Sequence, residues 1–224
     1  MQPYLRVWLF FVAIAIYKTY LCFFTEKRTR MNFLAHAYLS FGDPDVLMGN
    51  MIADLVKGKQ IELYPEAVQR GIHIHRQIDA FTDNHPVTHE TAEVFRTSAG
   101  KYAGAFLDVA YDHFLALDEL NIPKGGWHAF SERSYNQIEQ YGDIFPEKFL
   151  SMFMYMRSED WFYNYRYGWM IERSFERLKN RASYLDDDAP VFEEFEQHYK
   201  TIESGYNVFF PELKAHIREI SQTR

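Results

Sequence analysis

The chain has 224 residues, of which 47% are hydrophobic, 18% aromatic and 25% charged. This composition excludes a predominantly disordered protein. The single cysteine, Cys22, excludes an intramolecular disulfide and a cysteine-based zinc cluster. The net charge of −7 gives no basic field of the kind that binds nucleic acid. We therefore expect a folded protein with a large apolar core and no nucleic-acid partner.

The first 30 residues differ from the rest of the chain. Residues 7–24 are almost entirely apolar and have the minimum length of a membrane-spanning helix. Basic residues follow this stretch. If residues 7–24 anchor the protein in a membrane, these basic residues would hold the following domain on the cytoplasmic side. Alternatively, residues 1–30 are an upstream extension created by a misassigned start codon, with Met31 as the natural start. In both cases residues 31–224 form the predicted domain, which carries a net charge of −11.

From residue 31 onward, apolar residues recur at the helical spacings of three and four. Asp43 and Pro44 predict a helix start. Pro65 opens a helix that runs to about Phe81, and a strongly apolar helix spans residues 103–117. No run rich in Val, Ile or Thr predicts a strand. The prediction is an all-α fold, one domain of about eight to ten helices preceded by the apolar N-terminal helix. Further helix starts are expected at Pro146, Pro190 and Pro211.

The predicted helix 103–117 carries two carboxylates on one face. Asp108 and Asp112 are four residues apart, about 40° around the helix axis. The helix is apolar on nearly all sides and is therefore expected to be buried. Because like charges in a buried patch repel each other, the pair needs a bound cation or nearby Arg and His side chains.

Three other apolar helical stretches hold polar pairs at the same spacing. His75 and Asp79 are four residues apart, so both side chains can reach one metal ion. Mixed carboxylate and imidazole ligands suit Mn²⁺, Fe²⁺ or Mg²⁺, and also Zn²⁺, and helix-borne ligands that converge in a core build such sites. The predicted metal ligands are His36, Asp54, His75, Asp79, Asp108 and Asp112, with Asn32, Asn50, Asp83 and His113 as supporting residues.

Each pair also has a structural alternative. A single buried histidine is more often a hydrogen-bonded core residue than a metal ligand. Asp54 could pair with a nearby lysine, and a buried Asp–His hydrogen bond could explain His75 and Asp79. A protein of another class, a membrane-anchored helical binding protein with structural polar pairs, would then contain no stoichiometric metal. A helical di-iron oxygenase would contain iron and require oxygen.

Four motifs occur in a fixed order over residues 31–118: MNFLAHAYLS, GNMIADLVKGK, GIHIHRQIDAFTDNHP and LDVAYDHFLA. Together they resemble the acyl carrier protein phosphodiesterases, a family related to the HD-type metal-dependent phosphohydrolases. The resemblance implies an all-helical HD-like fold, removal of the 4′-phosphopantetheine arm from holo-acyl carrier protein, and a divalent cation, preferably Mn²⁺. It places the metal region at Asp54, His75, Asp79, Asp108 and Asp112, with His36 in the opening motif.

Two features depart from what the resemblance implies. The adjacent His-Asp dipeptide of HD enzymes is absent, and the chain has His75-x₃-Asp79 and the reversed Asp112-His113 instead. Acyl carrier proteins are acidic, and so is this domain. Docking therefore requires a local basic patch, for which the candidates are Arg157, Arg166 and Arg173.

The predicted reaction is metal-assisted phosphodiester hydrolysis. The cation, held in part by Asp79, lowers the pKa of a bound water. Arg76 or Lys57 neutralises charge on the phosphoryl oxygens. His113, or alternatively His73, protonates the leaving serine oxygen. The nearest alternative is an HD-type phosphohydrolase of a nucleotide or small phosphate ester.

Overall fold

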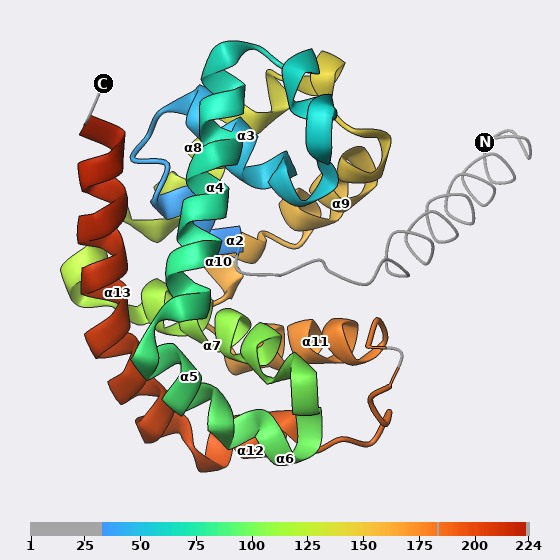
Figure 1. Ribbon diagram of the computed structural model, residues 1–224, viewed down its shortest axis with the longest axis vertical. Coiled ribbons are helices and arrows are strands. Elements are labelled where there is room, and N and C mark those ends of the chain that lie inside the picture. Colours follow the sequence, from blue (N-terminus) through green and yellow to red (C-terminus); the bar gives the residue numbers. More distant parts are fainter. Residues whose placement is uncertain (1–32, 183, 223–224) are drawn as a thin grey trace, which may run out of the picture.

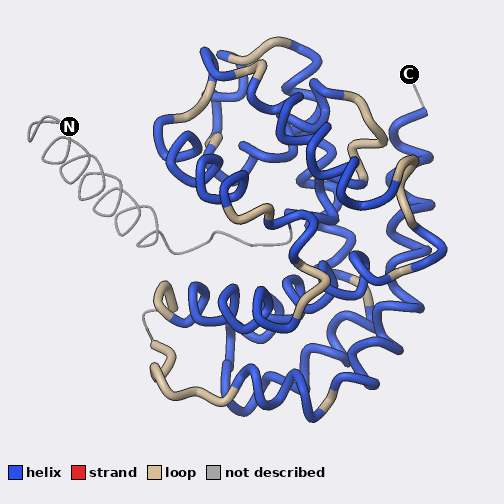
Figure 2. The backbone as a smooth tube through the Cα atoms, turned by 180° about the vertical axis from the view of Figure 1, so that it is seen from behind, coloured by secondary structure: helices blue, strands red, loops and turns tan. Residues whose placement is uncertain are grey.

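The structure is a computed structural model that describes residues 33–182 and 184–222 (Figure 1). All regular elements in these ranges are helices, and Figure 2 shows no strand among them, so the predicted all-α fold is confirmed. Two of the described α-helices, α6 (Arg96–Ala99) and α10 (Trp161–Asn164), are single turns of four residues. The ten longer ones agree with the predicted number. These are α2 (Phe33–Tyr38), α3 (Pro44–Ile52), α4 (Glu66–Asn84), α5 (Pro86–Ala92), α7 (Ala103–Leu117), α8 (Gly126–Glu139), α9 (Glu147–Ser158), α11 (Gly168–Lys179), α12 (Val191–Gln197) and α13 (Tyr199–Gln222).

Helix α7 is the central element, and its bounds are those predicted from the sequence. Twelve of its 15 residues are buried, as its nearly uninterrupted apolar sequence requires. It packs against α2, α5, α11 and α13. Because α7 is surrounded on all sides, its polar side chains must find partners inside the protein.

Helices α3 and α4 form the most extensive helix pair (Figure 1). Helix α3 begins where the sequence predicts, since Oδ1 of Asp43 accepts hydrogen bonds from the backbone amides of Asp45 and Val46. Gly49 of α3 and Gly71 of α4 lie at the contact, where no side chain separates the two backbones. Helix α3 then tightens into a short 3₁₀ segment, η1 (Ala53–Leu55), and a second one, η2 (Gly58–Leu63), leads toward α4.

The 24-residue helix α13 runs along α4, α5 and α7 (Figure 1). Pro146 and Pro190 directly precede α9 and α12, as predicted. The prediction for Pro211 is wrong, because this residue lies inside α13. A proline there removes one helical hydrogen bond. The burial of Phe209, Phe210 and Leu213 beside it keeps the helix continuous.

The predicted N-terminal helix and membrane anchor, residues 7–24, lie outside the described residues. So does the predicted domain boundary at residue 31. Among helices of the ranges that the structure does describe, none combines the length and the apolar character needed to cross a membrane.

Candidate metal centre

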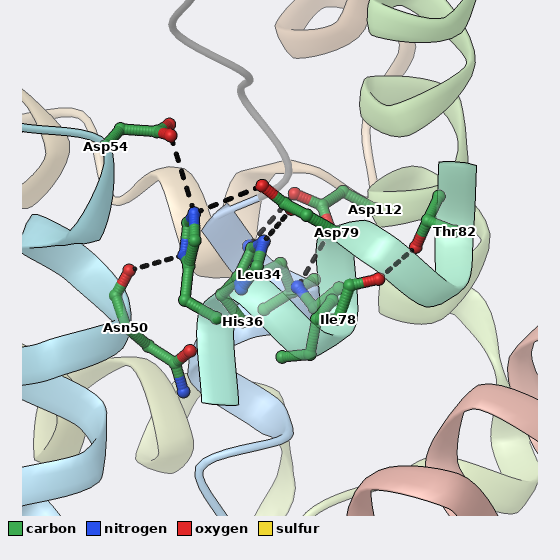
Figure 3. Close-up of polar contacts among 10 residues, drawn as sticks. Leu34, His36, Asn50, Asp54, Ile78, Asp79, Thr82 and Asp112 are labelled. Atoms are coloured by element: carbon green, nitrogen blue, oxygen red, sulfur yellow. Dashed lines mark hydrogen bonds and ion pairs between the residues drawn. The ribbon is translucent and has the colours of Figure 1, made fainter. Parts of the chain in front are cut away.

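Three separate elements bring four of the predicted ligands together. His36 comes from α2, Asp54 from η1, and His75 and Asp79 from adjacent turns of α4 (Figure 3). Nε2 of His75 lies 3.5 Å from Oδ1 of Asp54 and 3.5 Å from Oδ2 of Asp79. Nε2 of His36 lies 3.4 Å from Oδ1 of Asp79. The sequence therefore predicted correctly that these four side chains meet.

The separations match those between ligands on one metal ion. Ligand atoms about 2.1 Å from a common ion lie roughly 3–3.5 Å from each other in tetrahedral or octahedral coordination. One ligand atom each from His36, His75 and Asp79 lies within 4.8 Å of the other two. The rings of His36 and His75 are stacked, with centroids 4.0 Å apart. His36, His75 and Asp79 have the geometry and the chemistry to hold one divalent cation, and Asp54 adjoins this group through its contact with His75.

The histidine nitrogens support this interpretation. Nδ1 of His75 lies 2.9 Å from the carbonyl oxygen of Asn50, so this nitrogen donates its proton and Nε2 is the atom that can bind a cation in exchange for its proton. Nε2 of His75 and both ring nitrogens of His36 are buried and make no hydrogen bond to any described residue. Buried polar atoms normally have partners. A cation would satisfy the two Nε2 atoms at once.

Electrostatics couple the four groups. Burial alone would lower the pKa of His75, but the neighbouring carboxylates of Asp54 and Asp79 outweigh burial and raise the pKa to about 9. Burial, followed by the proximity of His75, lowers the pKa of His36. Burial would raise the pKa of Asp79, but the two imidazoles hold it far below its usual value. The site thus favours an ionised Asp79 carboxylate beside two closely spaced imidazoles.

The cluster is closed on one side and open on the other. The side chains of His36 and His75 are 2% and 8% exposed, whereas those of Asp54 and Asp79 are 23% and 22% exposed. A substrate can therefore approach on the carboxylate side while the imidazoles stay inside the core.

The structure places Asp112 outside this cluster and gives it another partner. Its two oxygens accept hydrogen bonds from the backbone amides of Leu34 and Ala35, at 2.9 Å and 2.8 Å (Figure 3). These amides belong to the first turn of α2, where backbone donors lack helical partners. Burial raises the pKa of Asp112 well above its usual value. Asp112 therefore ties α2, which carries His36, to α7.

Asp108 also lies apart from the four converging residues. Its side chain is buried and faces a small cavity next to Thr82 and Tyr111. Burial, with a contribution from the Asp108 charge, raises the pKa of Tyr111 to about 12. The predicted shared face of Asp108 and Asp112 exists, but its carboxylates do not join His36, His75 and Asp79 in one ligand group.

Of the predicted catalytic residues, Arg76 lies beside the cluster. It is exposed on α4, and its guanidinium donates to the carbonyl oxygen of Val56 at 3.4 Å. Val56 directly follows η1, which carries Asp54. This contact keeps a cationic group near the open side of the site, where an anionic substrate would arrive.

His113 has a different environment. Its Nδ1 lies 2.8 Å from the carbonyl oxygen of Tyr165, and its Nε2 lies 2.9 Å from the hydroxyl of Tyr199. Aromatic rings surround it, including those of Phe114 and Phe195. Both nitrogens are engaged away from the cluster, so this arrangement does not support a role as general acid. His73, the alternative acid, is exposed on α4 and lines a surface cavity with Asp43 and Arg70.

The predicted supporting residues have different outcomes. Asn50 contributes its backbone carbonyl to His75, and its side-chain amide donates to the hydroxyl of Ser40. This hydroxyl in turn donates to the carbonyl oxygen of His36. Ser40 carries no charge and has no special spacing, so nothing in the sequence distinguishes it from other serines. Asp83 is exposed at the end of α4, and Asn32 lies outside the described residues.

The predicted basic patch is largely neutralised. Arg157 pairs with Glu139 at 2.9 Å, and Arg173 pairs with Glu159 at 2.6 Å. The guanidinium of Arg166 lies over the ring of Tyr163. These three residues therefore do not form a free cationic surface.

Comparison with known proteins identifies the family. A family model described as "Acyl carrier protein phosphodiesterase" matches residues 31–213. A protein of that name from Salmonella paratyphi A is 34% identical over 186 residues, which cover 83% of this chain and 96% of the relative. One from Enterobacter sp. is 33% identical over 184 residues, or 82% and 95% of the two chains. The chain belongs to the acyl carrier protein phosphodiesterase family.

Membership in this family makes the chain an enzyme of the phosphoric diester hydrolase class. The family match includes all four residues that converge around His75 and begins at Met31, the first residue of the predicted domain. No solved structure matches the chain.

Proposed function

We propose that this protein hydrolyses the phosphodiester between 4′-phosphopantetheine and the serine of holo-acyl carrier protein, releasing the apo form. The observation that carries the proposal is the convergence of two buried imidazoles and two carboxylates, with the histidine Nε2 atoms facing the carboxylate oxygens. The names of the relatives support the choice of substrate. The cytoplasmic location inferred from the sequence is part of the same proposal.

We assign the metal ligands to His36, Asp54, His75 and Asp79. Two nitrogen and two carboxylate donors without a thiolate favour Mn²⁺, with Mg²⁺ and Fe²⁺ as alternatives. A cation held by these residues supplies Lewis acidity, which makes a water molecule nucleophilic near neutral pH and stabilises phosphoryl charge. Asp108 and Asp112 then serve the scaffold around the site and not the ion directly.

The protein's own residues prepare the site in three ways. The carbonyl of Asn50 fixes the tautomer and the orientation of His75. One oxygen of Asp79 contacts Nε2 of His36 and the other contacts Nε2 of His75, so this carboxylate bridges the two imidazoles. Arg76 presents a fork of N–H donors at the open side, where it can bind phosphoryl oxygens and offset their negative charge.

Mass spectrometry of the carrier protein tests the proposal. We expect the full chain to convert holo- to apo-acyl carrier protein in the presence of Mn²⁺, with loss of turnover after chelation and recovery when Mn²⁺ is restored. A panel of nucleotides and small phosphate esters serves as the comparison. Turnover of that panel without turnover of the carrier protein would transfer the assignment to a small-molecule phosphohydrolase. Elemental analysis that finds no stoichiometric metal in active protein would reject the metal centre.

A further inference from the structure

A further cavity borders the C-terminal end of α2. Its volume is about 600 Å³, and it is formed by the turn between α2 and α3, the loop before α8, α8 itself and the C-terminal end of α13. Tyr38 of α2 lines it, whereas His36 belongs to the metal cluster. His36 and Tyr38 are two positions apart in α2, which places their side chains about 200° apart around the helix axis. None of the four proposed metal ligands lines this cavity, so it is separate from the phosphodiesterase site.

The charged side chains around this cavity are all basic. Lys124, Arg133 and Arg218 line it, and no aspartate or glutamate does. None of the three forms an ion pair with a carboxylate of the described residues. The guanidinium of Arg133 donates to the carbonyl oxygen of Lys124 at 2.9 Å, which fixes these two residues beside each other. Three unpaired cations at one cavity are unexpected in a chain with a net charge of −7 and create a local site for an anion.

The remaining wall is mostly apolar. Leu47 and Phe130 line it, together with the ring of Phe41, over which the Arg218 guanidinium lies at 5.4 Å. Phe41 has a φ of +50°, a conformation that is strained for a bulky residue. Gly42 after it has a φ of +84°. This strained turn holds the Phe41 ring at the cavity, and such strain is found most often at functional sites.

We propose that this cavity binds a soluble small molecule in which an anionic head, a phosphate or a carboxylate, is joined to an apolar chain. The three cations bind the head through charge-assisted hydrogen bonds. Phe41, Leu47 and Phe130 cover the chain. The volume lies in the range of small-molecule sites. The net negative charge of the protein opposes binding to an anionic membrane surface, which favours a soluble ligand.

Isothermal titration calorimetry with octyl phosphate tests this site on the full chain, both loaded with Mn²⁺ and after chelation. We expect binding in both states, because none of the proposed metal ligands lines the cavity. Octyl phosphate should bind more than about tenfold more tightly than inorganic phosphate, since only the former buries apolar surface. Octanol, which has the apolar chain but no anionic head, should bind no more tightly than inorganic phosphate. Binding that occurs only with Mn²⁺ would overturn the proposal, because it would place the ligand at the metal centre.

Charge removal supplies the matched comparison. The triple variant Lys124→Gln, Arg133→Gln, Arg218→Gln should weaken octyl phosphate binding by about tenfold or more, with unchanged circular dichroism because all three side chains are exposed. The control is Arg157→Gln, an exposed arginine on α9 that is paired with Glu139, and it should bind like the parent protein. Equal loss in both variants would overturn the assignment to this cavity. The proposal would also be overturned if the protein bound vesicles that contain phosphatidic acid but did not bind octyl phosphate. Neither result depends on phosphodiesterase activity.

Discussion

Gly49 of α3 and Gly71 of α4 are in backbone contact: a β-carbon on Gly49 would lie 2.6 Å from the Cα atom of Gly71. This contact sets the distance between the two helices that supply the cluster. Asn50 follows Gly49 directly, and His75 lies one turn after Gly71, so the hydrogen bond between them depends on the close approach.

Replacing Gly71 with alanine should therefore damage both the fold and the site. The new β-carbon would lie 2.4 Å from the carbonyl oxygen of Val46, and backbone cannot move aside as a side chain can. We expect Gly71→Ala to lower the free energy of unfolding by about 2–3 kcal/mol, measured by urea denaturation. Gly104→Ala is the control, because nothing lies within 4 Å of the added carbon; it should be neutral or slightly stabilising. Equal stability of the two variants would contradict the tight contact.

Asp112 allows a test that separates a structural carboxylate from a metal ligand. Asp112→Ala leaves the buried amides of Leu34 and Ala35 without acceptors. We expect the metal-free protein to lose about 2–4 kcal/mol of stability, measured by denaturant unfolding after chelation. If Asp112 were instead a ligand, its removal would relieve a buried charge. The metal-free protein would then keep its stability, and only the Mn²⁺ affinity would fall.

His75→Gln and Asp79→Asn should show the opposite pattern. Each removes a proposed ligand, so the Mn²⁺ affinity should fall by about tenfold to a hundredfold or more, measured by electron paramagnetic resonance of free Mn²⁺. Carrier-protein hydrolysis should fall in parallel. Asp83→Asn, one turn further along α4 and exposed, is the matched control. Unchanged Mn²⁺ binding in Asp79→Asn would remove the residue from the ligand set.

Arg76→Ala should affect turnover without affecting folding. The residue is exposed, and its hydrogen bond to the carbonyl of Val56 is long. Loss of its charge beside the phosphoryl group should lower kcat/KM by about tenfold to a hundredfold at saturating Mn²⁺. Arg96→Ala, an exposed arginine paired with Glu93, should leave kcat/KM unchanged. An equal effect of both substitutions would rule out a specific role for Arg76.

The buried His113 should make stability depend on pH. Burial lowers its pKa in the folded protein below the value of 6.5 that it has when unfolded. The unfolded chain therefore binds more protons as the pH falls below about 6.5, and the folded state loses stability there, by at most about 1.4 kcal/mol per pH unit. His113→Gln can retain hydrogen bonds to Tyr165 and Tyr199 but does not titrate. Urea unfolding at pH 7.5 and at lower pH should show a flatter profile for the variant. Parallel profiles would contradict the assignment.

Local pattern was enough to predict part of this structure. The uninterrupted apolar sequence of residues 103–117 gives the bounds of α7, and the i, i+4 spacing of His75 and Asp79 gives a pair on one face of α4. Both features depend on helical geometry alone. That this pair meets His36 and Asp54 was predicted only because all of them belong to polar pairs at i, i+4 spacing in apolar helical stretches. No local rule places these stretches next to each other.

Tertiary contacts decided the rest. Asp112 has the same spacing from Asp108 as Asp79 has from His75, yet its partners are amides 78 and 77 residues earlier in the chain. No spacing rule distinguishes a carboxylate that caps a distant helix from one that binds an ion. Pro211 stays inside α13 for a similar reason, since the packing of neighbouring side chains against α4, α5 and α7 outweighs the local tendency of proline to end a helix.

Three of the four proposed ligands are on α-helices, whereas Asp54 is on η1, which has three residues. A short 3₁₀ segment has few hydrogen bonds to break, while α4 cannot move without disturbing its long contact with α3. The metal centre thus takes three ligands from two α-helices and one ligand from a short 3₁₀ segment. Adaptation to substrates of different bulk, in this protein or by mutation, is therefore expected to occur around residues 53–57.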